Sequence, residues 1–419
     1  MSREFKNSGV PWLKDVPMDW KVERGKNVLV LQKRPVRDND EVVTCFRDGE
    51  VILRSLRRTE GFTMSDKEIG YQGINEGDIV IHGMDGFAGA MGVSKSTGKG
   101  SPVLVVCTPK YDCVPQYIIY YLRALAMTDV FVALATGIRE RSCDLRWNKI
   151  SELEFIIPTA IEQQKIASFL DEKCSEIDEM VVLQEKIIEE LKAYKQSVIT
   201  EAVTKGLNPD VPMKDSGIEW IGEIPEHWEV NLLSTLFDEH KQKNIQLQET
   251  NLLSLSYGKI VRKDINTNEG LLPQSFEGYN IITKGDIVFR LTDLQNDKKS
   301  LRTGLCMEKG IITSAYVTIR ARRKIYSSYY HYLVHSYDVC KVFYGMGDGV
   351  RQGMNYSDLR KLLLVSPNFE EQQSIANYLD EKCSEIDTLI NIKQDKIESL
   401  KEYKKSIIYE YVTGKKEVI

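Results

Sequence analysis

The sequence predicts an α/β protein in which two globular domains are joined by two long antiparallel coiled-coil helices. Three observations support this prediction. The chain has 419 residues, more than one hydrophobic core usually serves. Segments of the first half recur about 208 or 209 residues later, and each half closes with an apolar pattern of helical spacing. We therefore expect an internal duplication with an approximate two-fold relation.

The duplication is clearest in the nine residues LDEKCSEID, which occupy 170–178 and again 379–387. Identity around this motif is high: 25 of 45 positions match when 162–206 is aligned with 371–415. Other matched pairs are SGVPWLKDVPMDWKV with SGIEWIGEIPEHWEV, and GDIVI with GDIVF. A period this long is far beyond that of solenoid repeats, so two larger modules stand in tandem.

The first part of each module predicts a mixed globular domain. Short runs such as VILRSL, DIVIHG and SPVLVVCTP have strand character and are separated by glycine-rich turns, while QYIIYYLRALA has helical character. We place domain one at 1–158 and domain two at 217–367, with a linker at 207–216 and a tail at 414–419. Trp12, Trp20, Trp220 and Trp228 are expected to pack each module's start against the helix ends.

The second part of each module predicts one long helix, at 159–206 and at 368–413. Apolar residues alternate at spacings of three and four, which is the pattern of a coiled-coil seam. The seam residues are Leu170, Cys174, Ile177, Val181, Ile188 and Leu191, with Leu379, Cys383, Ile386, Ile390, Ile397 and Leu400. Looser packing is expected where polar residues interrupt the seam, at Gln184, Lys195, Lys393 and Lys404.

Chain order favours an antiparallel pair. The second helix leaves domain two and must run back toward domain one if the seams pack, which predicts a bar with a domain at each end and the chain termini close together. Thr159 with Glu162, and Asn368 with Glu371, predict capping boxes at the helix starts. Gly206 is expected to end the first helix. The alternative is that each helix packs only on its own domain.

Composition excludes several classes. The sequence contains no run of about 18 apolar residues, so it predicts no membrane span. Its polar first residues lack the apolar core of a signal peptide. Eight cysteines without a Cys-x-x-Cys pair are typical of reduced thiols in a cytoplasmic protein. The net charge of −5 means that only local basic patches could bind nucleic acid.

Two similar but diverged domains at a fixed separation suit recognition of two different short sequences. Half-sites on double-stranded DNA present their major grooves on one face when they are one turn, about 34 Å, apart. Identical domains would read a palindrome. Diverged domains instead predict an asymmetric bipartite site.

The chain resembles the specificity subunits of type I restriction-modification enzymes over essentially its whole length. The resemblance is carried by the paired SGVPWLKDVPMDW and SGIEWIGEIPEHW openings and the paired GDIV strands. It is carried also by GIRERSCDLRWNKISELEFIIP, GVRQGMNYSDLRKLLLVSP and the two EQQ-x-IA-x-(F/Y)-LDEKCSEID helices. The ordered set, repeated at one offset, is highly specific.

This resemblance implies two target-recognition domains, a helical spacer and assembly with two adenine-methyltransferase subunits. Two restriction-motor subunits can join them in that family. The subunit supplies sequence recognition that directs methylation and restriction, and no chemistry. S-adenosylmethionine, ATP and Mg are expected only on the partner subunits, and no cofactor or metal is expected on this chain.

The sequence itself carries no catalytic motif that we recognise. It lacks Asn-Pro-Pro-Tyr, Asp-Pro-Pro-Tyr and a Gly-x-Gly-x-x-Gly after a strand. GVSKSTGKGS at 92–101 fails as a phosphate loop, because Gly100 replaces the Ser or Thr that would bind magnesium. His331 and His335 lie at i and i+4, yet no third ligand is near them.

Basic segments are candidate DNA contacts, since arginine binds guanine bidentately and Gln or Asn binds adenine. A solvated surface charge is the alternative for each residue. Arg139 and Arg351 are favoured because both modules keep a Gly-Ile/Val-Arg loop before the long helix. The full set is Arg34, Arg37, Arg54, Arg57, Arg58, Arg139, Arg141, Lys259, Arg262, Arg290, Arg351, Gln352 and Asn355.

Two other functions stay open. A coiled-coil scaffold whose end domains bind proteins would show no DNA sequence preference in a gel-shift assay of the assembled complex. A fused enzyme with an unrecognised active site would transfer methyl groups without a partner.

Overall fold

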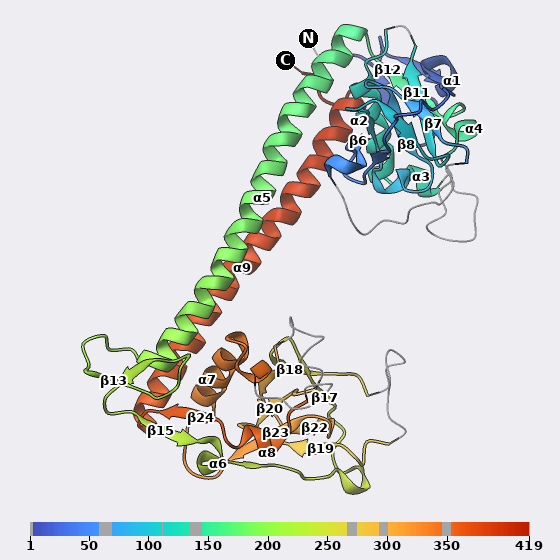
Figure 1. Ribbon diagram of the computed structural model, residues 1–419. Helices are drawn as coiled ribbons and strands as arrows, with labels where there is room; N and C mark the ends of the chain where they lie inside the picture. The colour runs from blue at the N-terminus through green and yellow to red at the C-terminus, as the bar shows by residue number, and fades with distance from the viewer. Residues whose placement is uncertain are drawn as a thin grey trace. The chain divides into compact units, whose positions relative to one another are not determined.

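The computed structural model describes residues 3–57, 69–110, 112–133, 145–265, 275–292, 301–345 and 353–418. The chain divides into two compact units, 1–185 with 394–419 and 186–393. Each unit therefore contains part of both long helices, α5 (Ala160–Lys205) and α9 (Phe369–Val412). Each unit is described by itself below (Figure 1).

Unit 1 is built on a four-stranded antiparallel sheet with the order β4-β11-β8-β9. Antiparallel pairs β1-β2, β5-β6, β10-β7 and β12-β3 surround it. The strands are β1 Phe5–Asn7, β2 Asp15–Pro17, β3 Lys21–Arg24, β4 Leu29–Leu31, β5 Val43–Cys45, β6 Val51–Leu53, β7 Gln72–Ile74, β8 Ile79–His82, β9 Met91–Val93, β10 Gly98–Gly100, β11 Leu104–Pro109 and β12 Glu154–Ile157. The short helices are α1 Gly25–Val28, α2 Pro115–Met127, α3 Val130–Ala133 and α4 Trp147–Ile150.

Unit 2 repeats this plan with a sheet of order β16-β23-β20-β21 and the pairs β13-β14, β15-β24, β17-β18 and β19-β22. Its strands are β13 Met213–Asp215, β14 Glu223–Pro225, β15 Glu229–Leu232, β16 Phe237–Glu239, β17 Leu253–Ser256, β18 Lys259–Arg262, β19 Asn280–Ile282, β20 Ile287–Phe289, β21 Thr303–Leu305, β22 Gly310–Ile312, β23 Val317–Ala321 and β24 Leu363–Ser366. Its short helices are α6 Leu233–Leu236, α7 Ser327–Val339 and α8 Tyr356–Leu359. The predicted duplication of an α/β fold is confirmed.

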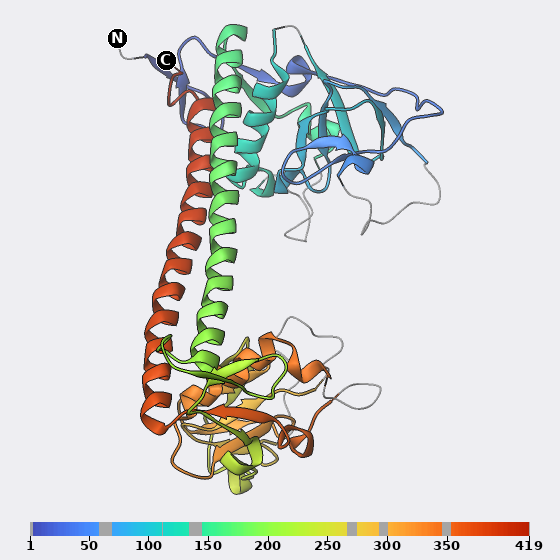
Figure 2. The ribbon, with the colours of Figure 1, turned by 60° about the vertical axis from the view of Figure 1, so that its left-hand side comes forward.

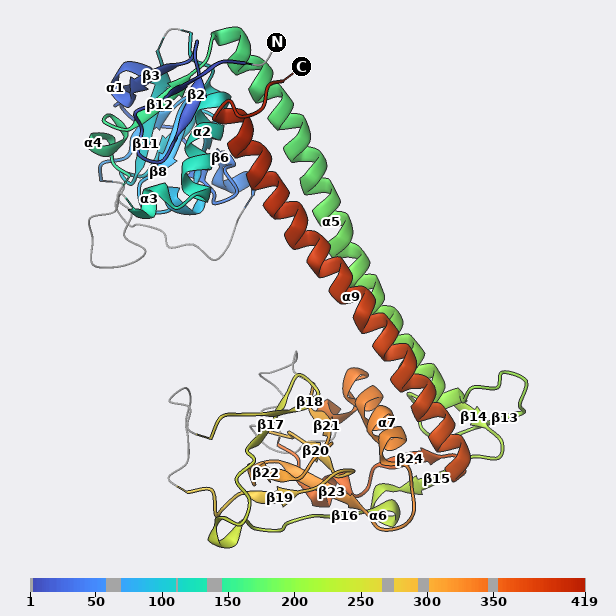
Figure 3. The same ribbon diagram turned by 180° about the vertical axis from the view of Figure 1, so that it is seen from behind.

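The two long helices pair in an antiparallel way within each unit (Figure 3). In unit 1, the ring of Phe169 packs on that of Tyr411, and Asp178 binds Lys404. Residue numbers therefore increase along α5 in the direction in which they decrease along α9. In unit 2, Lys195 binds Asp387 in the same sense. Of the twelve predicted seam residues, all are buried except Val181 and Leu191, which are partly buried.

The polar interruptions of the seam differ from the expectation at two positions. Lys404 lies 2.6 and 2.7 Å from the carboxylate oxygens of Asp178, and Lys195 lies 2.7 Å from both oxygens of Asp387. Both aspartates are the last residue of the repeated LDEKCSEID motif. The expected looser packing is therefore replaced at these two lysines by a cross-helix ion pair.

Each long helix ends against a buried tryptophan. Gly206 and Gly414 have φ angles of 76° and 73°, the left-handed conformation that favours glycine at a helix end. A Cβ at Gly206 would lie 3.2 Å from the ring of Trp228, and one at Gly414 would lie 3.1 Å from that of Trp20. The chain ends accordingly lie together in unit 1 (Figure 2), and the anchoring predicted for Trp20 and Trp228 is confirmed.

The predicted capping boxes form only in part. Thr159 and Asn368 accept hydrogen bonds from the backbone N–H of Glu162 and Glu371 at 3.3 and 2.9 Å. The Glu162 carboxylate, however, accepts from the indole of Trp20 at 2.9 Å, and the Glu371 carboxylate lies 3.0 Å from His227. Tertiary partners thus take the place of the local return bond.

Candidate nucleic-acid interface

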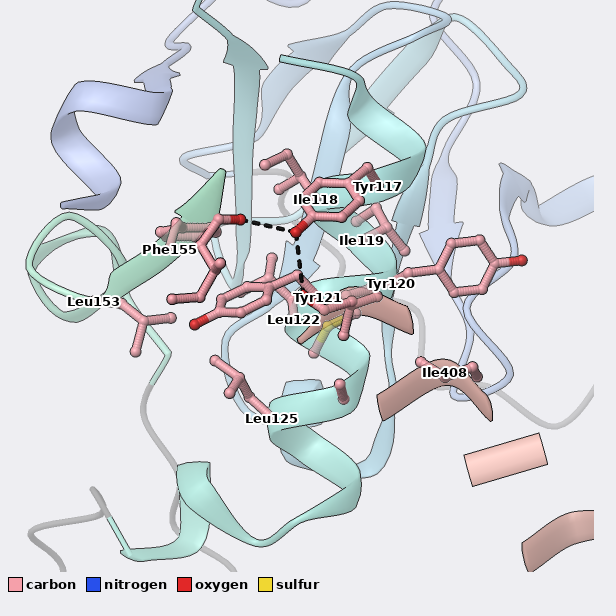
Figure 4. Packing of buried hydrophobic residues seen from close by; sticks show 14 of the residues in the cluster. Tyr117, Ile118, Ile119, Tyr120, Tyr121, Leu122, Leu125, Leu153, Phe155 and Ile408 are labelled. Atoms are coloured by element: carbon pink, nitrogen blue, oxygen red, sulfur yellow. Dashed lines mark hydrogen bonds between the residues drawn. The ribbon is translucent and has the colours of Figure 1, made fainter. Parts of the chain in front are cut away.

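A buried tyrosine on α2 or α7 fixes each domain to the long helix that ends there. The Tyr117 hydroxyl lies 2.9 Å from the carbonyl oxygen of Ile156 on β12 and 3.2 Å from that of Val412 on α9 (Figure 4). In unit 2, Tyr329 lies 3.2 and 3.1 Å from the carbonyls of Val365 and Val203. Burial raises the pKa of both hydroxyls, so both remain donors.

A second tyrosine on the same short helix fixes the domain to the long helix that begins there. Tyr120 donates to Asp171 and Tyr332 donates to Asp380, both at 2.7 Å. These acceptors are equivalent positions of the LDEKCSEID motif. Each domain is therefore held to both long helices by the same pair of contacts, and any reading surface on it has a fixed orientation to the helices of its unit.

The buried glutamine of each Glu-Gln-Gln sequence also binds the start of the long helix to its domain. Gln163 accepts from the N–H of Val114 at 2.9 Å and donates to the carbonyl of Pro158 at 3.0 Å. Gln372 accepts from the N–H of Tyr326 at 2.9 Å and donates to the carbonyl of Pro367 at 2.8 Å. This glutamine of the repeated helix motif therefore has a packing role in both units.

Two of the predicted arginines occupy equivalent places on the two domains. Arg54 follows β6 in the β5-β6 hairpin, and Arg262 ends β18 in the β17-β18 hairpin, 208 residues later. Arg54 donates to the Thr44 hydroxyl at 3.1 Å, and Arg262 donates to Glu308 at 2.8 and 3.0 Å. Each hairpin is a two-stranded sheet separate from the four-stranded sheet of its unit.

Several predicted arginines are bound to carboxylates of their own domain. Arg57 binds Asp48 and Glu50; the hydrogen bond to Asp48 raises the pKa of Arg57 and lowers that of Asp48. Arg262 and Glu308 shift each other's pKa in the same directions for the same reason. A DNA phosphate would have to compete with these carboxylates, so the free domain partly neutralises its own basic surface.

Arg34 has a structural partner. It binds both oxygens of Asp78, whose side chain is 4% exposed, and that carboxylate also accepts from the N–H of Asn75 at 2.8 Å. In unit 2 the equivalent Asp286 is bound by Arg320, which comes from β23, a different place in the fold. The aspartate of the repeated GDIV strand therefore binds an arginine in each unit, but the two arginines come from different places in the fold.

The other described candidates are more scattered. Arg37 reaches Asn75 at 3.5 Å, and Lys259 is exposed at the start of β18. The Arg290 N–H donates to the carbonyl of Arg302 at 2.8 Å just after β20. Asn355 caps α8 through a capping box with Asp358, which gives it a structural role. The candidates Arg58, Arg139, Arg141, Arg351 and Gln352 lie outside the described residues.

The described part of the chain has no candidate metal site. It contains no group of three or more His, Cys, Asp or Glu placed to hold a metal ion, and its seven cysteines are free. His331 and His335 lie with ring centroids 6.2 Å apart on α7 and are partly buried. Among the described helices, none has the length and apolar character needed to cross a bilayer.

Comparison with known proteins finds relatives that match almost the whole chain. No protein-family model matches the sequence. The MjaVIII type I restriction enzyme specificity subunit of Methanocaldococcus jannaschii is 26% identical over 96% of this chain and 93% of its own length. A protein assigned as the MjaX specificity subunit of the same organism is 24% identical over 96% and 94%. The chain is a homologue of the specificity subunits of type I restriction enzymes.

Solved structures share the fold of this specificity-subunit homologue. A chain from a structure of complex assembly and conformational transition of the type I R-M system has a TM-score of 0.69 and 14% identity, covering 95% of this chain and 99% of its own. The HsdS subunit from Thermoanaerobacter tengcongensis has a TM-score of 0.55 and 14% identity, covering 98% and 100%.

Sequence reasoning missed one buried arginine of the specificity-subunit homologue. The Arg302 side chain is fully buried, and its guanidinium donates to the carbonyls of Arg290 and Thr292 at 3.2 and 2.8 Å. It thereby fixes the backbone that leaves β20. A buried arginine has no signature in a single sequence, because only the fold shows that its surroundings exclude water.

Proposed function

We propose that this chain is the DNA sequence-recognition subunit of a type I restriction-modification complex. Each domain reads one half of an asymmetric bipartite site. The two continuous long helices that link the domains set the number of base pairs between the half-sites. The subunit carries no catalytic activity and directs adenine methylation and restriction by its partners.

One observation carries this proposal: the frame of each unit is repeated while the basic residues on it are not. Tyr117, Tyr120 and Asp178 have counterparts with the same contacts in unit 2. Among the described candidates, the 208-residue offset pairs Arg54 with Arg262, but it pairs Arg57 with Ile265 and Lys259 with Val51. A shared frame with unlike readers suits two different half-sites.

Each unit also exposes large apolar residues at equivalent positions of its long helices. In unit 1, Met180, Leu183 and Tyr403 are 48%, 54% and 56% exposed. Their counterparts in unit 2, Leu389, Ile392 and Tyr194, are 45%, 54% and 59% exposed. We call these six residues the repeated exposed set. The repetition of large exposed apolar residues at equivalent positions supports two copies of one partner, the adenine methyltransferase.

Two restriction-motor subunits can join the proposed complex. S-adenosylmethionine, ATP and Mg belong to the partner subunits in this proposal. The negative net charge of this chain, −5, fits a division of labour in which partners supply much of the phosphate contact.

The test is a methylation assay with the assembled complex and a library of DNA sites. Arg54→Ala should relax selection at one half-site and Arg262→Ala at the other, each by about 1–3 kcal/mol of discrimination. Arg24→Ala removes an exposed arginine at the end of β3, where it pairs with Glu152, and serves as the matched control. Methylation without sequence preference by the unmodified complex would contradict the proposal.

A further inference from the structure

A groove of about 600 Å³ opens in unit 2 between the end of α5 and the β13-β14 hairpin. Figure 3 labels both strands of that hairpin beside the helix end. Its apolar lining includes Tyr194, Val198, Ala202, Leu207, Met213 and Tyr378. Tyr194, Leu207 and Met213 are 59%, 43% and 36% exposed, so three large apolar side chains of one groove face solvent.

Unit 1 fills the corresponding place with its own side chain. The 209-residue offset pairs Ala202 with Tyr411 and Tyr378 with Phe169. The rings of Tyr411 and Phe169 lie with centroids 4.5 Å apart and planes inclined at 41°, and both pack against the core of unit 1. In unit 2, alanine provides no ring to pack on Tyr378. By this correspondence, the residue that stands in place of Tyr411 in unit 2 is Ala202, which lines the groove.

We infer that the groove of unit 2 receives an aromatic side chain of the methyltransferase subunit. The inference rests on the proposed function and specifies one of its contacts. The ring stacks on Tyr378 over Ala202 and Val198, as Tyr411 stacks on Phe169 within unit 1. Glu201, Lys205 and Glu223 line the groove as well and provide polar partners for a phenol or indole group.

The choice of the methyltransferase follows from continuity with the repeated exposed set. Tyr194 belongs both to that set and to the groove wall. A subunit that covers Tyr194 in unit 2 therefore reaches the groove, whereas the same subunit covering Tyr403 in unit 1 meets Tyr411 already in place. Two identical copies of the partner consequently differ in one contact, because only the copy on unit 2 can fill a groove. The copy on unit 2 therefore binds more tightly.

The decisive variant is Ala202→Tyr, which transfers the residue of unit 1 into unit 2. Stepwise binding of purified methyltransferase to the full chain is measured by analytical ultracentrifugation. In the unmodified chain we expect the two dissociation constants to differ by about tenfold or more. Ala202→Tyr should weaken the tighter step about tenfold and bring the two constants together, because its own ring closes the groove.

The matched control is Thr200→Tyr. It adds the same ring two residues away on α5, where unit 1 naturally has Tyr409 and where the side chain does not line the groove. This variant should bind both partner copies as the unmodified chain does. Met213→Asp gives a second test, since it charges the wall from the hairpin without altering α5, and it should weaken the same step.

The outcomes separate the two levels of the account. Unchanged binding constants for Ala202→Tyr and Met213→Asp would overturn the groove assignment while leaving the proposed function intact. Self-association of the unmodified chain that Ala202→Tyr abolishes would also overturn it, because the occupant would be a second copy of this chain. Failure of the unmodified chain to bind any methyltransferase would instead contradict the proposed function.

Discussion

The ammonium group of Lys404 lies 2.6 and 2.7 Å from the two carboxylate oxygens of Asp178, across the seam between α9 and α5 in unit 1. The lysine side chain is only 19% exposed, whereas the aspartate is 63% exposed. The same pair recurs in unit 2 as Lys195 and Asp387. These contacts place a charge at a position where a coiled coil normally has an apolar residue, and they tie the helices in one register.

Removing the acid should cost more than removing the base. Asp178→Asn leaves a largely covered ammonium group without its partner, and we expect the free energy of unfolding to fall by about 1 kcal/mol. Lys404→Met replaces the ammonium with an apolar side chain on the seam and should be nearly neutral. Urea unfolding checks both, with Glu398→Gln as the control because its partner Lys401 lies on the same exposed helix face. Equal costs for the two changes would contradict this account.

The tyrosines that anchor the domains should contribute measurably to stability. Tyr117→Phe and Tyr329→Phe each remove a buried hydroxyl that serves two backbone carbonyls, and each should destabilise its unit by about 1–2 kcal/mol. Differential scanning calorimetry measures the change. Tyr403→Phe removes an exposed hydroxyl and should leave the transition unaltered. No loss in either buried variant would show that these hydroxyls do not hold the helix ends.

Two histidines of α7 predict a loss of stability in acid. Burial lowers the pKa of His331 to about 3 and that of His335 to about 4. Below pH of about 6.5 the unfolded chain takes up protons that the folded chain cannot accept, so stability falls as the pH drops toward 4, by up to about 1.4 kcal/mol per pH unit for each group. The stability is fully present above pH of about 6.5.

The check is urea unfolding of the His331→Leu, His335→Leu double variant from pH 7 to pH 4. Its stability should fall less steeply than that of the unmodified chain. The same acid slope in both proteins would rule out His331 and His335 as its source.

The fold was largely predictable because its signals are repeated and local. The spacing of Leu170, Cys174 and Ile177, the helix-ending Gly206 and the matched GDIV strands each needed only the sequence pattern. The antiparallel pairing then followed from chain order. These features depend on periodicity and backbone conformation, which a single sequence records.

The partners of charged residues were not predictable, because the fold brings them from distant parts of the chain. The sequence alone suggests that Arg34 is a free basic residue, but the fold brings it to Asp78, 44 residues away. The sequence alone suggests that the Glu162 side chain caps its own helix, but in the fold it accepts a hydrogen bond from Trp20. Lys404 reads as a weak point of the seam until the register places Asp178 opposite it. In each case the three-dimensional partner decides the role of the residue type.

The central claim is tested most directly by mapping methylated adenines across the genome of cells that contain this chain and of matched cells in which it has been deleted. We expect methylation at one split sequence, with two unlike half-sites and a constant number of base pairs between them, and its complete loss on deletion. Methylation that persists unchanged after deletion, or that marks a single uninterrupted sequence, would contradict the account.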